Sequence, residues 1–226
     1  ALFSIDSKLS KKFAPQAVES GAVVIDNSNA FRMSPEVPLV IPEINPEMIS
    51  THEGIIANPN CSTIQLVMAC ESIYSNYEIK RMVVSTYQAV SGTGKKAVDE
   101  LKKQIQEFIA GKELTKSVYS HQIAFNLLPQ IDDFQENGYT REELKVIRET
   151  RKILADENIP ITVTAVRVPV LNGHGESVNI ETEADFKIND IKRLITESEN
   201  VKLIDDPENG VYPMPNMIEK DDDILV

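Results

Sequence analysis

Residues 54–74, GIIANPNCSTIQLVMACESIY, decide the fold of this 226-residue chain. The apolar run 54–57 predicts a short buried strand, the Asn- and Pro-rich segment 58–60 a turn, and the apolar stretch 62–74 a helix. Short strands alternate with turns before this stretch, and longer strands and amphipathic helices follow it. We therefore place a boundary near Asn60, with an α/β part before it and an α+β domain after it.

The other expected elements follow from periodicity and turn residues. The expected helices are 7–20, 62–74, 95–109, 140–154 and 189–197. The expected strands are 22–25, 39–41, 54–57, 81–90, 161–170, 177–182 and 201–204, with 161–170 paired to 177–182. Thr140 and Glu143 have the spacing of a capping box. The helix over 95–109 has an apolar stripe made of Val98, Leu101, Ile105 and Ile109.

Composition narrows the class of function. The 23 Lys and Arg face 35 Asp and Glu, a formal net charge of −12, which disfavours a nucleic-acid-binding protein. The net charge does not exclude small anionic substrates, because a few Arg and Lys side chains can dominate the local electrostatic field. No apolar run approaches the ~18 residues of a membrane helix, and no signal peptide is evident. Two cysteines are too few for a disulfide framework, so we expect a reducing cytoplasm.

Cys61 is the first candidate for chemistry, because it follows the Asn-Pro-Asn turn at the expected start of a helix. A thiol at a helix N-terminus feels the positive end of the helix dipole, which favours the thiolate and lowers the thiol pKa. The alternative is a buried structural cysteine, which is how we interpret Cys70 in the middle of the same helix. We therefore predict that Cys61 is a nucleophile.

A cysteine nucleophile usually needs a base, and His174 is the best placed of the three histidines. Glycines on both sides of it, in NGHGE 172–176, leave the imidazole open to a ligand; the alternative is a turn histidine on the surface. His52 and His121 are interpreted as surface or structural residues. Arg167 shares one face of an alternating strand with apolar residues, so we expect it to point inward and to need a carboxylate or phosphate partner.

Two further motifs have weaker signals. Glu142 and Lys145 are three residues apart on a predicted helix and can share one face; the alternative is a solvated pair. Segment 91–97, SGTGKKA, matches G-x-G-x-x-A between a strand and a helix, but no strand with an acidic end follows it, so it is weak as a dinucleotide fingerprint. It remains credible as a glycine loop whose amides approach a ligand. No motif of metal catalysis or serine hydrolysis is present, so we predict no metal site.

Taken together, these residues resemble the aspartate-semialdehyde dehydrogenase family. The stretches that carry the resemblance follow in the family's order: DNSNAFRM 26–33, VPLVIPEIN 37–45, IANPNCSTIQ 56–65, TYQAVSGTG 86–94, EELKVIRETRKIL 142–154 and VRVPVLNGHGESVNIET 166–182. The resemblance implies an NADPH-dependent enzyme that reduces L-aspartyl 4-phosphate to L-aspartate 4-semialdehyde through a cysteine thioester, on the route to lysine, threonine and methionine. It also implies a partial Rossmann-like domain over 1–60 and, over 61–226, a catalytic and dimerisation domain like that of glyceraldehyde-3-phosphate dehydrogenase.

The resemblance assigns the chemistry to five residues. Cys61 would be the nucleophile and His174 the acid/base, while Gln88 would position the acyl group. Arg167 would bind the α-carboxylate of the substrate, and Glu142 its α-amino group.

The resemblance also implies the binding groups. Arg32, Asn60 and Lys145 would hold the phosphate, and Ser91 and Gly92 would contact the cofactor, NADP(H). The expected partners are the small substrate and further copies of the chain, as a dimer or tetramer, without nucleic acid or membrane.

The chain departs from the family's pattern at its ends, which look cut. The N-terminal glycine-rich loop with its first strand and helix, and the C-terminal strand and helix, are not in this sequence. Segment 3–8, FSIDSK, stands where the family has a small glycine-containing stretch. We therefore expect intact substrate-side residues and lost or weakened NADPH binding. The alternatives are a non-catalytic dimerisation fragment of that enzyme, or a related reductase of N-acetyl-glutamyl phosphate, whose acetylated amine has no charge for Glu142 to meet.

Overall fold

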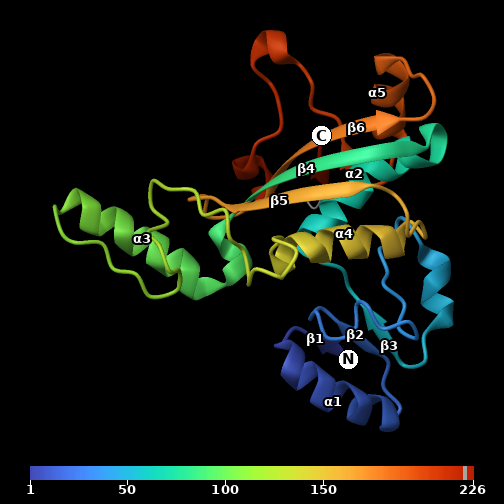
Figure 1. Cartoon of the computed structure of the whole chain (residues 1–226), viewed down its shortest axis with the longest axis horizontal. Coiled ribbons are helices and arrows are strands. Elements are labelled where there is room, and N and C mark those ends of the chain that lie inside the picture. The colour runs from blue at the N-terminus through green and yellow to red at the C-terminus, as the bar shows by residue number, and fades with distance from the viewer. Residues whose placement is uncertain (221–222) are drawn as a thin grey trace.

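The structure of the protein, a computed structural model, describes residues 1–220 and 223–226. Helices and strands alternate along the chain, and short 3-10 helices (η) occupy several turns (Figure 1). In chain order the elements are β1 (Leu2–Phe3), α1 (Ser7–Glu19), β2 (Val24–Asp26), η1 (Pro46–Thr51), β3 (Ile55–Ala57), α2 (Cys61–Tyr77), β4 (Ile79–Gln88), η2 (Val90–Thr93), α3 (Lys95–Ile109), α4 (Arg141–Ile153), β5 (Ile161–Arg167), β6 (Gly175–Thr182), α5 (Ile188–Glu197), β7 (Val201–Lys202), η3 (Pro207–Asn209), η4 (Pro215–Lys220) and β8 (Ile224–Leu225).

The first sheet is parallel, with strand order β1-β2-β3. Segment 3–8, which departs from the family's pattern, includes the end of β1 and the start of α1. Asp6 in this segment accepts hydrogen bonds from the backbone N–H groups of Lys8 and Leu9. The strand predicted at 39–41 is wrong, because Leu39 forms only an isolated bridge with Ala57. Pro38 and Pro42, on either side of residues 39–41, have no backbone N–H, so they remove hydrogen-bond donors that a strand would need.

The second sheet has the order β5-β4-β6, with β4 parallel to β5 and antiparallel to β6. The predicted pairing of 161–170 with 177–182 is therefore wrong, because β4 lies between β5 and β6. The loop 168–174 carries the chain past the end of β4, where the backbone N–H of Ala89 donates to His174 Nδ1 (3.0 Å). This crossing brings the ends of all three strands of the sheet into one region.

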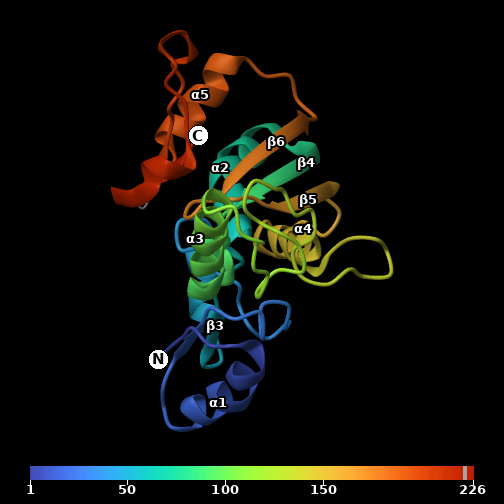
Figure 2. The ribbon, with the colours of Figure 1, turned by 90° about the vertical axis from the view of Figure 1, so that its left-hand side faces the viewer.

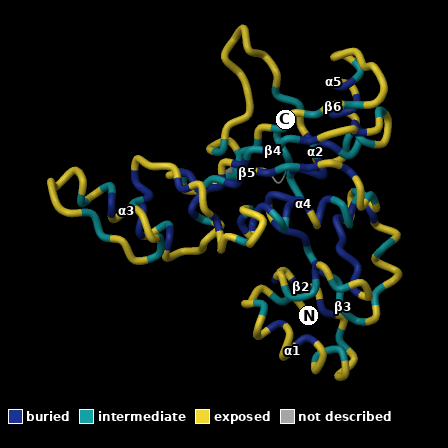
Figure 3. Tube along the Cα trace, in the orientation of Figure 1, coloured by how far each residue is buried: buried dark blue, intermediate teal, exposed yellow. Residues whose placement is uncertain are grey.

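Helices α2 and α4 cover one face of the second sheet (Figures 1 and 2). The core between them consists of apolar side chains that alternate on the strands and recur along the helices: Leu66, Cys70, Ile79, Met82, Val84, Val146, Ile147, Ile159, Ile161 and Val163. The predicted capping box is confirmed at the start of α4, where Thr140 and Glu143 bond to each other's backbone N–H groups. Buried segments gather in this central layer (Figure 3).

The opposite face of the second sheet is not covered by any described helix of the chain (Figure 2). Its side chains are half-buried or exposed, and Tyr87, near the carboxyl end of the central strand β4, is 45% exposed. Helix α3 and the loop that follows it project from the body (Figure 1). The predicted apolar stripe on α3 is wrong at its C-terminal end, where Ile109 is 79% exposed. The helix extends there beyond the loop that covers Leu101.

The remaining predicted elements are confirmed, with ends that differ by at most three residues. The last strand predicted from the sequence, 201–204, is present as the shorter β7, which pairs with β8, while Asp221 and Asp222 lie outside the described residues. The boundary at residue 60 stays a prediction. None of the described helices is both long and apolar enough to cross a membrane.

Candidate active site

The candidate site lies where β4 and β5 end and α2 begins. Gln88 and Arg167 are register partners at the carboxyl ends of these parallel strands. Cys61 is the first residue of α2, and His174 is on the loop before β6. Ligands of α/β sheets commonly bind beyond the carboxyl ends of parallel strands. The fold thus gathers residues that are more than 100 positions apart in the sequence.

Asn60 forms the start of the helix that carries Cys61. Its Oδ1 accepts the backbone N–H groups of Ser62 (2.9 Å) and Thr63 (3.4 Å), a side-chain N-cap. The predicted place of Cys61 at a helix start is confirmed, and the residue is exposed beside this cap. Cys70 is buried, and burial raises its pKa to about 12.

The predicted lowering of the Cys61 pKa is wrong. Partial desolvation raises this pKa, and the nearby Glu142 carboxylate raises it further. A hydrogen bond from the Ser62 backbone and the charges of Arg167 and Arg32 act in the opposite direction but do not outweigh the increase. The helix dipole was readable from the sequence, but the facing carboxylate was not.

Glu142 is the acceptor that joins the polar residues of the site. Its Oε1 accepts Asn60 Nδ2 (2.9 Å) and Gln88 Nε2 (3.1 Å), and its Oε2 accepts Lys145 Nζ (3.0 Å). Burial opposes its ionisation, but the charge of Lys145 and the amides of Asn60 and Gln88 keep the Glu142 pKa below its ordinary value. The predicted shared face of Glu142 and Lys145 is confirmed, and the solvated-pair alternative is wrong because Glu142 is only 6% exposed. Lys145 also pairs with Asp132 (2.9 Å).

Arg167 points inward, as its strand position predicted, and is 6% exposed. Its Nη1 donates to the Ala89 carbonyl (2.7 Å), while its buried Nε has no hydrogen-bond partner in the structure. His174 accepts the Ala89 N–H through Nδ1, so its neutral form carries the proton on Nε2. Burial and Arg167 lower the His174 pKa to about 4, against a smaller opposing effect of Glu142.

Gly92 lies against these two side chains. A Cβ added there would meet Arg167 Nη1 at 3.0 Å and His174 Nε2 at 3.1 Å, so a side chain at this position would push into the site. Ser91 precedes it in η2. The glycine therefore leaves room beside these two side chains, and a contact of Ser91 and Gly92 with a cofactor stays a prediction.

Arg32 reaches the site region from the first part of the chain and is 6% exposed. Its Nη1 donates to Glu149 Oε1 (3.1 Å) and its Nη2 to the Asn27 carbonyl (2.9 Å), while its buried Nε has no partner in the structure. Sequence reasoning missed Glu149. Its position, seven residues after Glu142 on the same helix face, was the available signal.

Glu176 is a second buried carboxyl that sequence reasoning missed. Neither of its oxygens has a hydrogen-bond partner in the structure, and burial raises its pKa to about 8, with the hydroxyl of Ser62 opposing the increase. It follows His174 by two residues, the spacing that returns a side chain to the same side of a strand.

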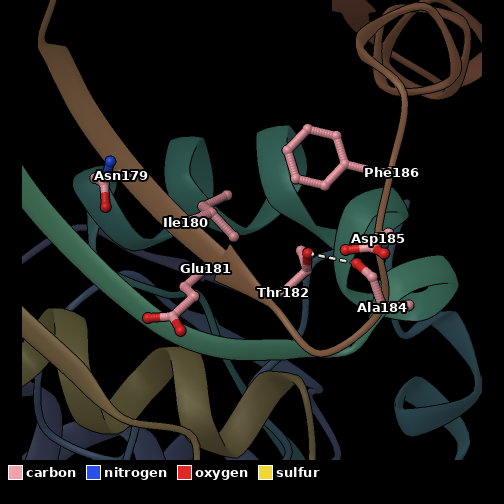
Figure 4. A pocket seen from close by; sticks show the side chains of 7 residues that line it. All are labelled: Asn179, Ile180, Glu181, Thr182, Ala184, Asp185 and Phe186. Atoms are coloured by element: carbon pink, nitrogen blue, oxygen red, sulfur yellow. Dashed lines mark hydrogen bonds between the residues drawn. The ribbon is translucent and has the colours of Figure 1, made fainter.

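Other candidates lie apart from this region. His52 accepts the Gly54 N–H in a turn, and His121 is exposed. Two open hollows lie near the far end of β6, and one of them is lined by polar and acidic residues around Thr182 (Figure 4). Within the described part of the chain, no three His, Cys, Asp or Glu side chains are placed to hold a metal ion.

Comparison with known proteins identifies both parts of the chain. Residues 1–52 match the family model "Semialdehyde dehydrogenase, NAD binding domain", and residues 70–226 match "Semialdehyde dehydrogenase, dimerisation domain". The whole chain is 52% identical to the aspartate-semialdehyde dehydrogenase of Aquifex aeolicus and 47% identical to that of Bacillus subtilis, covering 67% and 68% of those proteins. The chain therefore spans about two thirds of these relatives' length.

Solved structures give the same result. The crystal structure of aspartate semialdehyde dehydrogenase II from Vibrio cholerae matches with a TM-score of 0.92 and 45% identity, over 95% of this chain and 64% of that one. A second structure of that enzyme, complexed with ASA, matches with a TM-score of 0.92 and 44% identity, again over 95% of this chain and 64% of that one. These matches confirm the predicted fold class.

Proposed function

This chain belongs to the aspartate-semialdehyde dehydrogenase family, and we propose that it carries the substrate-binding and acyl-transfer part of such an enzyme. The proposed reaction is the NADPH-dependent reductive dephosphorylation of L-aspartyl 4-phosphate to L-aspartate 4-semialdehyde and phosphate. One observation carries the proposal: an exposed thiol at the start of a capped helix lies among a buried carboxylate, Glu142, and two buried guanidinium groups, Arg167 and Arg32.

The charges of the site complement this substrate. Arg167 has a buried Nε without a partner, which a substrate carboxylate would satisfy with a charge-assisted hydrogen bond. Glu142 offers a buried carboxylate for the α-ammonium group. Lys145, Asn60 and Arg32 would meet the phosphate, and Lys145 uses two of its three donors on Asp132 and Glu142.

Substrate binding would also activate the thiol. The Glu142 carboxylate raises the Cys61 pKa. An ammonium group placed on Glu142 would offset that negative charge, so the thiolate would form when the correct substrate is bound. Cys61 Sγ would then attack the acyl carbon, the bond from carbon to the phosphate oxygen would break, and phosphate would leave with the bonding electrons as the thioester forms.

His174 would act on the carbonyl oxygen by donating a hydrogen bond from its Nε2–H. Because Nδ1 accepts the Ala89 N–H, the Nε2 proton is available to an oxygen that becomes negatively charged. The same N–H would keep its hydrogen bond to this oxygen while the carbon–sulfur bond breaks, the aldehyde is released and Cys61 leaves as the thiolate. Gln88, tied to Glu142, would hold the acyl group beside the thiol.

The cofactor assignment rests on the first part of the chain and on Gly92. Residues 1–52 match an NAD-binding domain model, and we propose NADP(H) as the cofactor. Ser91 and Gly92 would hold it, since only a glycine leaves room beside Arg167 and His174. A bound nicotinamide cofactor supplies the hydride that reduces the thioester.

We further propose a homo-oligomer, either a dimer or a tetramer, that acts in the cytoplasm. The match of residues 70–226 to a dimerisation-domain model supports self-association, and the uncovered face around Tyr87 is a surface available for it. The two cysteines are free, and a nucleophilic thiol has to remain reduced.

The test is phosphate-dependent reduction of NADP⁺ with aspartate semialdehyde, measured on the full-length gene product and on this chain in parallel. We expect activity in the full-length protein and its loss in Cys61→Ser, with the matched variant Cys70→Ser retaining activity. An inactive full-length protein, or an active Cys61→Ser variant, would overturn the assignment. Activity with the N-acetyl-glutamyl semialdehyde instead would favour the related reductase, and a silent chain beside an active full-length protein would favour the dimerisation fragment.

A further inference from the structure

Glu149 is a fully buried carboxylate in the middle of α4 for which the proposed reaction provides no role. Its two oxygens bond to two different parts of the molecule. Oε1 accepts Arg32 Nη1 (3.1 Å), from the first part of the chain, and Oε2 accepts the backbone N–H of Asn60 (2.6 Å), the residue before the nucleophile. A single carboxylate thus connects a candidate phosphate ligand with the start of α2.

Asn60 is held twice by α4. Its backbone N–H donates to Glu149, and its side-chain Nδ2 donates to Glu142, two helical turns earlier. Its Oδ1 is used to cap α2. The residue that precedes Cys61 therefore has its backbone donor and its side chain both anchored, which leaves little freedom for the start of the helix.

Arg32 is also held at two points, by groups of different kinds. Lys152, one turn after Glu149, donates through Nζ to the backbone carbonyls of Arg32 (2.8 Å), Ser34 (2.8 Å) and Val37 (2.9 Å). Lys152 fixes the backbone of this segment but does not touch the guanidinium group. The direction of the guanidinium group is instead set by Glu149, together with the Asn27 carbonyl.

We propose that Glu149 is a positioning residue that fixes the Arg32 guanidinium and the Asn60 backbone relative to each other, so that the phosphate is bound beside Cys61. This inference rests on the proposed function, because it takes Arg32 and Asn60 as phosphate ligands. Glu149 acts through these two residues and does not touch the substrate. Its own negative charge works against an anion, so its contribution is geometric.

Protection of Cys61 by inorganic phosphate measures this contribution in the chain itself. The rate of Cys61 alkylation by iodoacetamide is followed by mass spectrometry at increasing phosphate, and the half-protecting concentration is compared among variants. Glu149→Asp keeps the charge but is one methylene shorter and cannot keep both contacts, so we expect the half-protecting concentration to rise about tenfold, the effect of one lost charge-assisted hydrogen bond.

Glu149→Gln distinguishes geometry from charge. The amide keeps the length of the side chain but presents only one acceptor to two donors. Removing a negative charge near the site would by itself strengthen phosphate binding. Weaker protection in Glu149→Gln therefore supports positioning, whereas stronger protection would overturn it. This variant also carries the test if Glu149→Asp does not fold.

Glu143→Asp is the matched control. Glu143 is a buried glutamate on the same helix that accepts two backbone N–H groups, from Thr140 (2.6 Å) and Ala165 (3.0 Å), outside the phosphate region. We expect it to destabilise the chain without changing the half-protecting concentration more than twofold. An equal loss of protection in Glu143→Asp and Glu149→Asp would mean a general loosening of α4 and would overturn the proposal.

Arg32→Gln separates this inference from the proposed function. If Arg32→Gln weakens phosphate protection tenfold or more and the Glu149 variants do not, only the positioning role fails. If phosphate does not protect wild-type Cys61, or if Arg32→Gln leaves protection unchanged, the phosphate assignment fails and the positioning role fails with it.

Discussion

Replacing Glu176 by glutamine should remove part of the pH dependence of the folded chain's stability. Both carboxyl oxygens of Glu176 are buried without a hydrogen-bond partner, and burial raises its pKa from 4.5 to about 8. The unfolded chain therefore releases this proton near pH 4.5, while the folded chain keeps it until about pH 8. The stabilisation that Glu176 gives the folded chain is fully present below its unfolded pKa of 4.5 and is lost as the pH rises towards its folded pKa of about 8.

The size of the effect follows from the two pKa values. One pKa unit corresponds to about 1.4 kcal/mol, so the loss between pH 5 and pH 7 is about 2 to 3 kcal/mol. Glutamine has nearly the same shape and does not titrate. Any cost of burying the amide is the same at every pH, so the pH dependence of the difference between the two proteins measures Glu176 alone.

Urea unfolding at pH 5, 6, 7 and 8, at one protein concentration, measures this difference. We expect Glu176→Gln to gain about 2 to 3 kcal/mol relative to wild type between pH 5 and pH 7. Glu183→Gln is the matched control, an exposed carboxylate just beyond the end of β6, and should show no such gain. Parallel stability curves for wild type and Glu176→Gln across this range would refute a buried protonated Glu176.

Three further predictions concern the thiol and its surroundings. Glu142→Gln should lower the Cys61 pKa, because it removes a carboxylate that raises this pKa, so the rate of Cys61 alkylation between pH 6 and pH 9 should rise at a lower pH than in wild type. An unchanged or higher midpoint of this rate–pH curve would contradict the electrostatic argument. In the folded chain at pH 7.5, Cys61 should alkylate at least tenfold faster than Cys70, which is buried and has a pKa of about 12; equal rates would remove the case for an accessible nucleophile. Gly92→Ala should weaken protection of Cys61 by aspartate semialdehyde about tenfold without changing stability in urea by more than about 0.5 kcal/mol, because the added methyl group would meet only the Arg167 guanidinium and the His174 imidazole. Protection equal to that of wild type would contradict the close approach of residue 92 to these two side chains.

The elements were predictable where a local signal specifies them. The Asn60 cap and the Thr140 capping box use residues within three positions of each other, so both helix starts could be placed from the sequence. The order of the second sheet was not predictable in this way. The contact that places β4 between β5 and β6 joins segments about 75 to 100 positions apart, and no residue in the loop 168–174 signals that the chain crosses β4.

The features of the site also divide into those that a local sequence pattern predicts and those that depend on distant segments. The inward direction of Arg167 follows from the two-residue period of a strand, and the shared face of Glu142 and Lys145 follows from the helical period. The pKa of Cys61 could not be predicted with the right sign, because it depends on Glu142, which lies 81 positions later and meets the helix start only in the folded chain. Glu149 was within reach of the helical period, but its partners on two other segments were not.

The charge balance of the folded site explains how a chain with a net charge of −12 can accommodate an anionic substrate. Three cations, Arg32, Lys145 and Arg167, face three carboxylates, Glu142, Glu149 and the Asp132 that pairs with Lys145, so the charges within the site cancel although the whole chain is strongly negative. This balance holds only while the neighbouring groups are neutral. His174 has its pKa lowered to about 4 and Glu176 has its pKa raised to about 8, so at neutral pH neither contributes a charge. An ionised Glu176 would make the local sum negative, which gives the buried, unpartnered carboxyl a consequence for substrate binding above pH 8 as well as for stability below it.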